Sequence, residues 1–267
     1  MVLGRGIFLI LTLFAGHVVL SKPLIVAHRG ASYDAPENTL PAFELAWKQG
    51  ADAIEADFLL TKDGQVVCIH DRSTKRFSDQ NLVVANSTLK QLKTLDVGSW
   101  KSEKYAGTHI PTISEVFATV PKGKKIFVEV KCGVEIIQPL IREIKLSSLD
   151  SDQVNLICFK ADVIKSFKEK LPHYKAYWLS GFKKDKQGTW KPSIDKVFST
   201  IKNCNADGLD SQVTIPAEFS VGILDAGYEW HAWTINDVAT ARELEKRGIF
   251  SITTDRPKLI GLGFGLD

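Results

Sequence analysis

The chain has 267 residues, of which 44% are hydrophobic and 24% are charged, a composition typical of a globular protein with a large core. This length allows one or two domains, and one domain of barrel size is the simplest interpretation. The formal net charge of +3 is too small to indicate a nucleic-acid-binding protein or strong attraction to a membrane surface.

The four cysteines show neither a CxxC spacing nor a pattern of histidine partners, which argues against a zinc site. Three of them, Cys68, Cys132 and Cys158, lie in apolar, strand-like segments where we expect buried free thiols. In an exported protein a pair could instead be oxidised, and the sequence does not select which pair.

The first 21 residues have the layout of a secretory signal peptide. Arg5 provides a short positive region, residues 7–20 are almost wholly apolar, and residues 19–21 offer a plausible cleavage point. The apolar stretch is short for a membrane span, but an uncleaved anchor is the alternative because no clear Ala-x-Ala site is present. We therefore expect residues 1–21 to be a signal peptide and residues 22–267 the mature domain. The protein would be exported to the periplasm or the extracellular space, and anchored to a membrane only if the leader is retained.

The chain after this leader begins with a strand, a helix and a second strand. Residues 24–27 form a short apolar run that ends in His28, and Asn38 or Thr39 can cap a helix over residues 40–49. The apolar run at residues 51–60 predicts the second strand. A strand, a helix and a strand in so few residues indicate a βαβ unit with parallel pairing and a right-handed crossover.

The second strand continues into a predicted hairpin. Asp63-Gly64 supplies a tight turn, and residues 65–69 run back as the second arm and bring His70 toward the carboxylates of the second strand. Residues 72–110 are polar and irregular apart from a short helical stretch at 88–95. We interpret them as an excursion over one end of the domain rather than as a separate domain.

From residue 114 onward, helices and strands alternate regularly. The expected strands are 125–130, 153–159, 174–180, 206–209, 228–235 and 248–253, and the expected helices are 114–120, 134–145, 161–170, 193–203, 216–226, 238–247 and 257–262. Eight βα units over about 250 residues match the (β/α)8 TIM barrel, here with a small hairpin and loop insertion after the second strand. An open doubly wound sheet is the alternative, but no GxGxxG follows the first strand.

Acidic residues occupy inward positions on adjacent predicted strands. Glu55 and Asp57 share one face of the second strand, and Glu129 and Lys131 share one face of the third. Barrel strands normally place Val, Ile or Leu there, and active sites of such barrels lie at the carboxyl ends of the strands. Three carboxylates offer hard oxygen ligands, which suit Mg²⁺ or Ca²⁺ better than zinc. The alternative is a structural ion cluster without a metal.

Two cationic side chains and two histidines are expected at the same carboxyl ends of the strands. Arg29 and Lys131 exceed what a bare cation site needs and suggest an anionic substrate such as a phosphate. His28 and His70 can act as one base and one acid on opposite sides of a phosphorus centre, and Asp71 could orient the ring of its neighbour His70. Taken singly, each histidine could merely end a strand or lie on a solvated hairpin.

The candidate site residues belong to a set of nine short motifs that follow one another in a fixed order. The set extends from about residue 24 to residue 259, and it resembles the pattern of a known family. These motifs are His28-Arg29-Gly30, Pro36-Glu37-Asn38-Thr39, Glu55-x-Asp57, Thr61-Lys62-Asp63-Gly64, Val67-x-Ile69-His70-Asp71, Ile110-Pro111-Thr112, Val128-Glu129-Val130-Lys131, Trp233-Thr234-x-Asn236 and Thr254-Asp255-Arg256-Pro257. The chain resembles the glycerophosphodiester phosphodiesterase family. One departure is Arg76-Phe77-Ser78, where the family often has an Arg-Thr-Thr-like segment.

The resemblance implies a (β/α)8 barrel that uses one divalent cation to hydrolyse glycerophosphodiesters to an alcohol and sn-glycerol 3-phosphate. Residue roles carried over by motif are His28 and His70 as the general acid/base pair, Glu55, Asp57 and Glu129 as metal ligands, and Arg29 and Lys131 as phosphate contacts. Trp233 resembles the aromatic residue at the family's pocket wall, although a barrel-core aromatic is an equal alternative. The other histidines, His109, His173 and His231, match no catalytic motif, and we expect them at the surface or in the core.

Two other functions stay open at this point. The same class of enzyme could cleave lysophospholipids, which carry the same glycerophosphodiester unit, and a long apolar groove near residues 72–110 would favour that. A barrel that only binds phosphorylated ligands is the non-catalytic alternative, but it would need no acid/base pair. The expected partner is thus a small phosphodiester, without nucleic acid and without stable membrane insertion once the leader is cleaved. The sequence does not indicate an oligomeric state.

Overall fold

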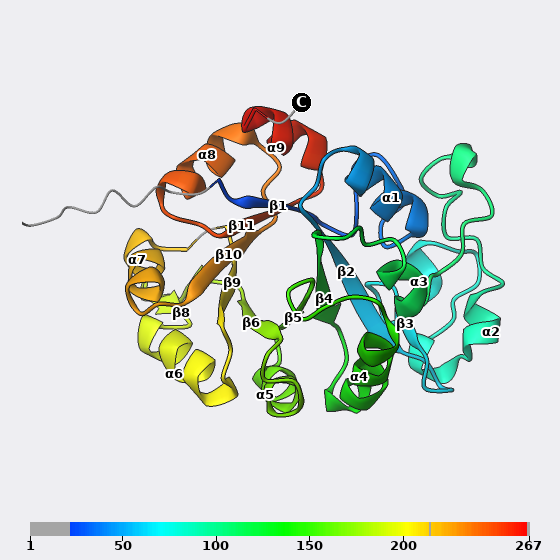
Figure 1. Ribbon diagram of the computed structural model, residues 1–267, viewed down its shortest axis with the longest axis horizontal. Coiled ribbons are helices and arrows are strands. Elements are labelled where there is room, and N and C mark those ends of the chain that lie inside the picture. Colours follow the sequence, from blue (N-terminus) through cyan, green and yellow to red (C-terminus); the bar gives the residue numbers. More distant parts are fainter. Residues whose placement is uncertain (1–21, 214, 266–267) are drawn as a thin grey trace, which may run out of the picture.

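The computed structural model describes residues 22–213 and 215–265, and its centre is a closed barrel of parallel strands (Figure 1). Within these residues eight strands follow one another in the order β1-β2-β4-β5-β6-β9-β10-β11, and pairing of β11 with β1 closes the barrel. Their bounds are β1 Leu24–Ala27, β2 Ala53–Leu60, β4 Lys125–Val130, β5 Val154–Cys158, β6 Lys175–Ser180, β9 Gly208–Gln212, β10 Glu229–Trp233 and β11 Ser251–Thr254. The predicted (β/α)8 barrel is confirmed.

Helices surround the barrel and cover its outer face (Figure 1). They are α1 Leu40–Lys48, α3 Ile113–Phe117, α4 Ile137–Leu146 after a 3-10 turn at Val134–Ile136, α5 Ala161–Lys170, α6 Ile194–Cys204, α7 Ala217–Asp225, α8 Val238–Lys246 and α9 Pro257–Gly263. Helix α4 shows why they pack there, because its buried residues Ile137, Leu140, Ile141 and Ile144 recur at helical spacing and form one apolar face. The helix α6 begins at a Ser193 side chain that accepts the Lys196 amide, and it ends at Asn205 in the left-handed conformation.

Buried side chains fill much of the interior of the barrel. One interior cluster consists of Val26, Ala53, Phe127, Ile157, Tyr177 and Leu179. The fully buried ring of His231 packs against Tyr177, with a centroid distance of 4.1 Å, and its Nδ1 lies 2.7 Å from the Ser251 hydroxyl. His231 is therefore a core residue, one of the two places expected for it, and the space open to a ligand lies at the carboxyl ends of the strands.

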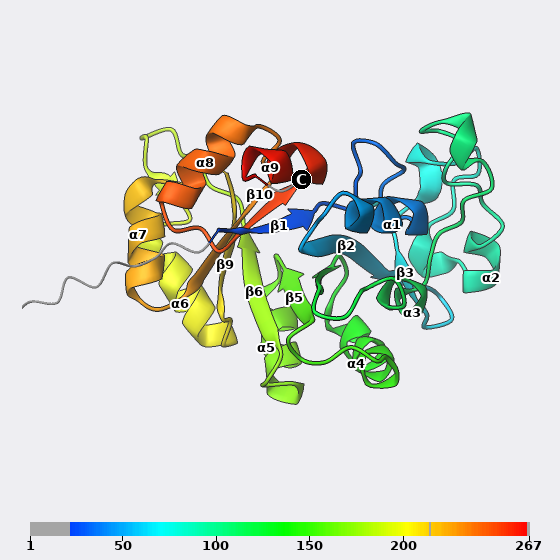
Figure 2. The same ribbon diagram turned by 45° about the horizontal axis from the view of Figure 1, so that its top comes forward.

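The segment after β2 forms the predicted hairpin and loop insertion. Strand β3 (Val66–Cys68) runs antiparallel to β2, and short helices follow, including α2 (Leu89–Leu92), which is shorter than the predicted helical stretch. Figures 1 and 2 show the insertion on one side of the barrel, beyond β3 and α3. It has an apolar cluster of its own, made of Leu59, Val67, Ile69, Phe77, Val84, Leu92, Leu95, Val97 and Ile110. Such a cluster allows the insertion to hold a fixed shape beside the barrel.

Several strand bounds differ from the sequence prediction by one to three residues, as in β11, which spans Ser251–Thr254 rather than residues 248–253, and two further differences have a clear physical cause. Strand β9 spans Gly208–Gln212 rather than residues 206–209, because its polar residues Asp210 and Ser211 interrupt the apolar pattern that predicts a strand. The polar loop before α6 contains an unpredicted two-stranded hairpin, β7 (Lys183–Lys184) with β8 (Trp190–Lys191). Neither difference changes the barrel topology.

The predicted signal peptide, residues 1–21, lies outside the described residues. In the part of the chain that the structure describes, no helix is both long and apolar enough to cross a membrane. All four cysteines are free thiols. Of the three expected to be buried, Cys68 and Cys158 are, whereas Cys132 is only partly buried.

Candidate active site

Three buried acids meet at the carboxyl ends of β2 and β4. Glu55 and Asp57 come from β2, Glu129 comes from β4, and the register pairs Asp57 directly with Glu129. All three residues are at most 8% exposed, and each contributes a carboxylate oxygen so that the three atoms lie within 4.8 Å of one another. The alternation of side chains along each strand thus produces the cluster that the sequence predicted.

The acids repel one another, and two cations offset part of this repulsion. Burial raises the pKa of Glu55 well above its usual value, and the charges of Asp57 and Glu129 add to the effect. Burial and Asp57 likewise raise the pKa of Glu129 to about 7. Asp57 behaves differently, because the positive charges of Arg29 and Lys131 outweigh its burial and lower its pKa.

The donor set fits a divalent cation. Glu55 Oε1 and Asp57 Oδ1 are buried atoms that accept no hydrogen bond from any described residue. Lys131 Nζ lies 3.4 Å from Asp57 Oδ1 and 2.6 Å from Glu129 Oε1. Carboxylate oxygens are the ligands that Mg²⁺ and Ca²⁺ prefer in proteins. The cluster could therefore hold one such ion.

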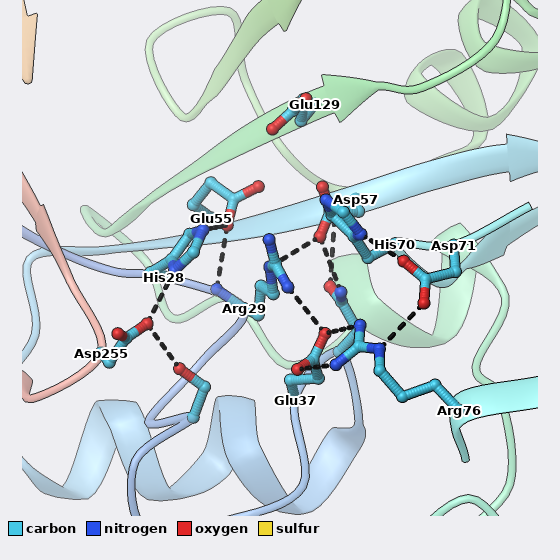
Figure 3. A network of polar contacts seen from close by, with 12 residues as sticks. His28, Arg29, Glu37, Glu55, Asp57, His70, Asp71, Arg76, Glu129 and Asp255 are labelled. Carbon is cyan, nitrogen blue, oxygen red and sulfur yellow. Dashed lines mark hydrogen bonds and ion pairs between the residues drawn. The ribbon is translucent and has the colours of Figure 1, made fainter. Parts of the chain in front are cut away.

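Arg29 links the first two barrel strands (Figure 3). Its amide donates to Glu55 Oε2 at 2.9 Å, and its Nε lies 3.1 Å from Asp57 Oδ2. Its Nη1 donates to Glu37 Oε1 at 2.8 Å. The guanidinium is thus fixed beside the acid cluster, at the mouth of the barrel.

The two histidines are each held through Nδ1 by a carboxylate. His28 Nδ1 lies 2.7 Å from Asp255 Oδ1, and His70 Nδ1 lies 2.6 Å from Asp71 Oδ1 (Figure 3). A carboxylate at Nδ1 favours the tautomer that carries its proton there, which leaves Nε2 as the atom for proton transfer. The predicted contact between Asp71 and His70 is confirmed. The Asp255 contact was not predicted, although Asp255 lies in one of the motifs.

Other residues orient this site, although the sequence analysis predicted no role in the site for them. The Asn38 side chain donates to Asp57 Oδ2 at 2.8 Å and accepts a hydrogen bond from the Asp57 amide. Of the two residues expected to cap α1, Asn38 and Thr39, it is Thr39 that occupies the N-cap position. Arg76, from the insertion, pairs with Glu37 and with Asp71. Their positions in or near the Pro-Glu-Asn-Thr and His-Asp motifs were the available signal, but only the fold shows that these segments touch.

A cavity of about 190 Å³ joins these groups at the barrel mouth. Charged residues line one side of it: His28, Arg29, Glu55, His70, Glu129 and Lys131. The opposite side is apolar apart from Asp210, Thr234 and Thr253, and its apolar residues are Ile157, Phe159, Leu179 and Trp233. Trp233 thus lies at a cavity wall, its ring edge-on to Phe159 with a centroid distance of 5.7 Å. The cavity is small compared with common ligand pockets, which indicates a small ligand.

Asp210 is a cavity residue that the sequence analysis did not identify. It projects from β9, is 1% exposed, and its Oδ1 accepts no hydrogen bond from a described residue. Burial raises the pKa of Asp210 well above its usual value, and the charge of Glu129 adds to the effect. The available signal was an acid directly after a predicted strand, because the prediction ended at residue 209 whereas β9 extends to Gln212.

The sequence of the chain matches the model of the Glycerophosphoryl diester phosphodiesterase family over residues 28–259. It is 32% identical over 247 residues to a glycerophosphodiester phosphodiesterase of Caldanaerobacter subterraneus, an alignment that covers 90% of this chain and 96% of the relative. It is also 32% identical over 243 residues to a putative glycerophosphodiester phosphodiesterase of Bacillus subtilis, covering 88% and 96% of the two chains.

Among the solved structures that are similar to this one are two phosphodiesterases with at least 26% sequence identity to this chain. The first is an Oleispira antarctica phosphodiesterase in complex with the product sn-glycerol-3-phosphate, with a TM-score of 0.83, 28% identity, and coverage of 91% of this chain and 97% of that one. The second is a glycerophosphodiester phosphodiesterase from Thermotoga maritima, with a TM-score of 0.72, 26% identity, and coverage of 89% and 96%.

Proposed function

Because the chain belongs to the glycerophosphoryl diester phosphodiesterase family, we propose that it hydrolyses glycerophosphodiesters to an alcohol and sn-glycerol 3-phosphate. The observation that carries the proposal is a cavity at the barrel mouth that brings together two of the three clustered acids, Glu55 and Glu129, with two cations and two carboxylate-held histidines. The names of the relatives and the product bound to the Oleispira enzyme support it. A protein that only binds a phosphate would not need two oriented histidines.

The proposal includes one divalent cation, Mg²⁺ or Ca²⁺, held by Glu55, Asp57 and Glu129. The buried, unpartnered oxygens of Glu55 and Asp57 and the nearby carboxylate of Glu129 support this assignment. When bound, such an ion would supply positive charge that polarises the phosphoryl oxygens. The three acids would at the same time lose much of their mutual repulsion.

Arg29 and Lys131 bind the phosphate in this proposal. Both line the cavity, and both are held in place by the acids beside them. Arg offers a planar fork and Lys a point charge to phosphate oxygens. Trp233 on the opposite wall would pack against the carbon chain of the substrate.

His28 and His70 act as the base and the acid. One imidazole removes the proton from the 2-hydroxyl of the glycerol, which attacks phosphorus, and the other protonates the leaving alcohol; water then opens the cyclic phosphate. Phosphodiesters without a neighbouring hydroxyl should therefore be poor substrates. Equal rates on matched substrates with and without that hydroxyl would refute the internal attack and favour direct attack by water.

The reaction is tested by incubating the purified protein with glycerophosphocholine, glycerophosphoethanolamine, glycerophosphoinositol and a lysophospholipid. Product release is measured with Mg²⁺, with Ca²⁺ and with a chelator. We expect cation-dependent release of sn-glycerol 3-phosphate from the first three. No turnover by a folded protein that binds the cation would favour the phosphate-binding barrel instead.

A further inference from the structure

The carboxyl group of Asp210 is a buried polar group without a protein partner. The residue is 1% exposed, its Oδ1 accepts no hydrogen bond from the described residues, and it lines the cavity that contains the catalytic histidines. A buried acceptor without a partner destabilises the fold, so a group of this kind in a cavity wall points to a ligand that completes its hydrogen bonding.

Asp210 lies on the far side of the barrel from the acid cluster. It projects from β9, and three strands separate β9 from β2 in either direction around the barrel. The residues around it on that side, Leu179, Ile157 and Trp233, present apolar surfaces to the cavity, and the Trp233 indole lies 3.4 Å from the Asp210 carbonyl oxygen. Asp210 is thus a single acceptor for a hydroxyl on an otherwise largely apolar wall.

The interior of the barrel next to Asp210 is filled by aromatic side chains. His231, which pairs in register with Asp210, is fully buried and packs against Tyr177 and Phe127, with centroid distances of 4.1 and 5.6 Å. A ligand that enters from the mouth and reaches Asp210 therefore ends there. The part of the substrate at this closed floor must have a fixed size.

In the proposed substrates the alcohols that leave differ in size, and the glycerol unit is common to all. The fixed floor therefore suits the glycerol, while the leaving group points to the open mouth. We propose that the Asp210 carboxyl accepts a hydrogen bond from the terminal hydroxyl of the glycerol unit and makes this hydroxyl a condition of efficient cleavage. This inference rests on the proposed function, and it holds for either protonation state of the acid because one carboxyl oxygen always accepts.

Specificity against acylated substrates follows from this contact. An acyl ester at the terminal hydroxyl removes the donated hydrogen and adds a chain where the barrel is closed. A second hollow beside the insertion is lined by apolar Leu60 and Val83 but also by the charged residues Lys62, Arg72 and Lys160. We therefore expect 1-acyl lysophospholipids to be poor substrates, and rapid cleavage of one would contradict the Asp210 contact and favour that second hollow as a chain site.

The direct test compares glycerophosphoethanolamine with its 2-hydroxypropyl analogue, which keeps the attacking hydroxyl and lacks only the terminal one. With the full-length wild-type protein we expect kcat/KM to be about 10–100-fold higher for the glycerol substrate. A ratio near one in the wild type overturns the inference while leaving the proposed function intact. Absence of turnover on both substrates overturns the proposed function itself, and the inference with it.

Variants then assign the discrimination to Asp210. Asp210→Leu removes the acceptor at similar volume and should bring the ratio close to one, mainly by lowering kcat/KM for the glycerol substrate. Asp210→Asn retains an acceptor oxygen and should retain most of the ratio, which also covers the case in which the Leu variant does not fold. Leu179→Met is the matched control, because Leu179 pairs with Asp210 in register and carries no polar atom. A ratio that survives in Asp210→Leu, or collapses equally in Leu179→Met, contradicts the assignment.

Discussion

Three buried acids occupy positions that a (β/α)8 barrel normally fills with Val, Ile and Leu. Their mutual repulsion is visible in the raised pKa values of Glu55 and Glu129, which burial causes in the first place and neighbouring acids increase. Arg29 opposes this rise at both residues and Lys131 opposes it at Glu129, but only Asp57 has a pKa below its usual value. A bound divalent cation would favour the ionised form of all three acids and reduce their mutual repulsion.

Removing one of these acids should weaken cation binding. In Glu129→Gln one carboxylate is replaced by a neutral amide of the same shape, so we expect a higher Mg²⁺ concentration for half-maximal activity and a loss of at least about 100-fold in kcat/KM. Glu135→Gln is the control, because Glu135 is an exposed acid just after β4 and outside the cluster. An Mg²⁺ dependence equal to that of the wild type in Glu129→Gln would show that Glu129 is not a ligand.

The lowered pKa of the Asp255 carboxyl group predicts how the free energy of unfolding depends on pH. Burial would raise its pKa, but hydrogen bonds from His28, Asn236 and Ser32 lower it to about 2. Because the folded-state value lies below the usual 3.8, the ionised carboxyl stabilises the fold above that value, and the contribution is lost as the pH falls from 3.8 to about 2.

Urea unfolding of the wild type and of Asp255→Asn at several pH values measures this contribution. The variant should be less stable at about pH 6, and the difference in free energy of unfolding should shrink below about pH 4. A difference that stays constant down to about pH 2 would show that the ionised form is not stabilised.

The pairing of strands brings together site residues that are distant in the sequence. The register of β2 with β4 places Asp57 beside Glu129, and this much follows from side-chain alternation in the sequence. The hairpin of β2 and β3 returns His70 to the same rim, as the Asp-Gly turn predicted. The contact of Asp255 with His28 depends on closure of the barrel by β11 and β1, which a motif by itself does not reveal.

Polar positions in an element are the ones that sequence patterns miss. Strand β9 was predicted too short because Asp210 and Ser211 break its apolar run, and the same polarity makes β9 part of the cavity wall. The β7–β8 hairpin was missed because both strands have only two residues and carry charged side chains. Apolar periodicity predicts which segments pack into the core. A polar functional residue interrupts this periodicity, so the element that carries it is predicted less well.

Arg76 connects the insertion with the loop before α1. Its guanidinium donates to both Glu37 oxygens at 2.8 and 2.9 Å and to Asp71 Oδ2 at 2.8 Å. Because Asp71 in turn orients His70, we expect Arg76→Ala to lower kcat by about 10-fold with a smaller change in KM. Arg72→Ala, at an exposed position of the same segment, should behave like the wild type. An effect on KM alone would mean that Arg76 shapes the cavity without orienting His70.

At the scale of the whole molecule, packing divides the barrel into a closed amino end and an open carboxyl end. The interior around Tyr177 and His231 is filled, and the cavity lies above it. The barrel, its insertion and the position of the site at the strand ends were predictable, because the alternation of strands and helices extends along most of the sequence. Closure of the floor and the place of Asp210 follow from three-dimensional packing and were not predictable.

A bound cation should stabilise the entire fold, because its ligands come together only when β2 and β4 pair. At a free concentration of 100 times its dissociation constant, one ion adds about 2.7 kcal/mol to the free energy of unfolding. We therefore expect Mg²⁺ or Ca²⁺ to raise Tm relative to a sample with chelator. In Glu55→Gln/Glu129→Gln this shift should vanish, and an equal shift in that variant would place the ion elsewhere.

The most direct test of the central claim is to follow a glycerophosphodiester by phosphorus NMR in the presence of Mg²⁺, with the wild type and with His28→Ala and His70→Ala. The account predicts conversion to sn-glycerol 3-phosphate by the wild type and rates lower by about 10²–10⁴-fold in each variant, with the fold retained. Conversion at the wild-type rate by either folded variant would contradict the assignment of the histidine pair, and no conversion by the wild type would contradict the proposed reaction.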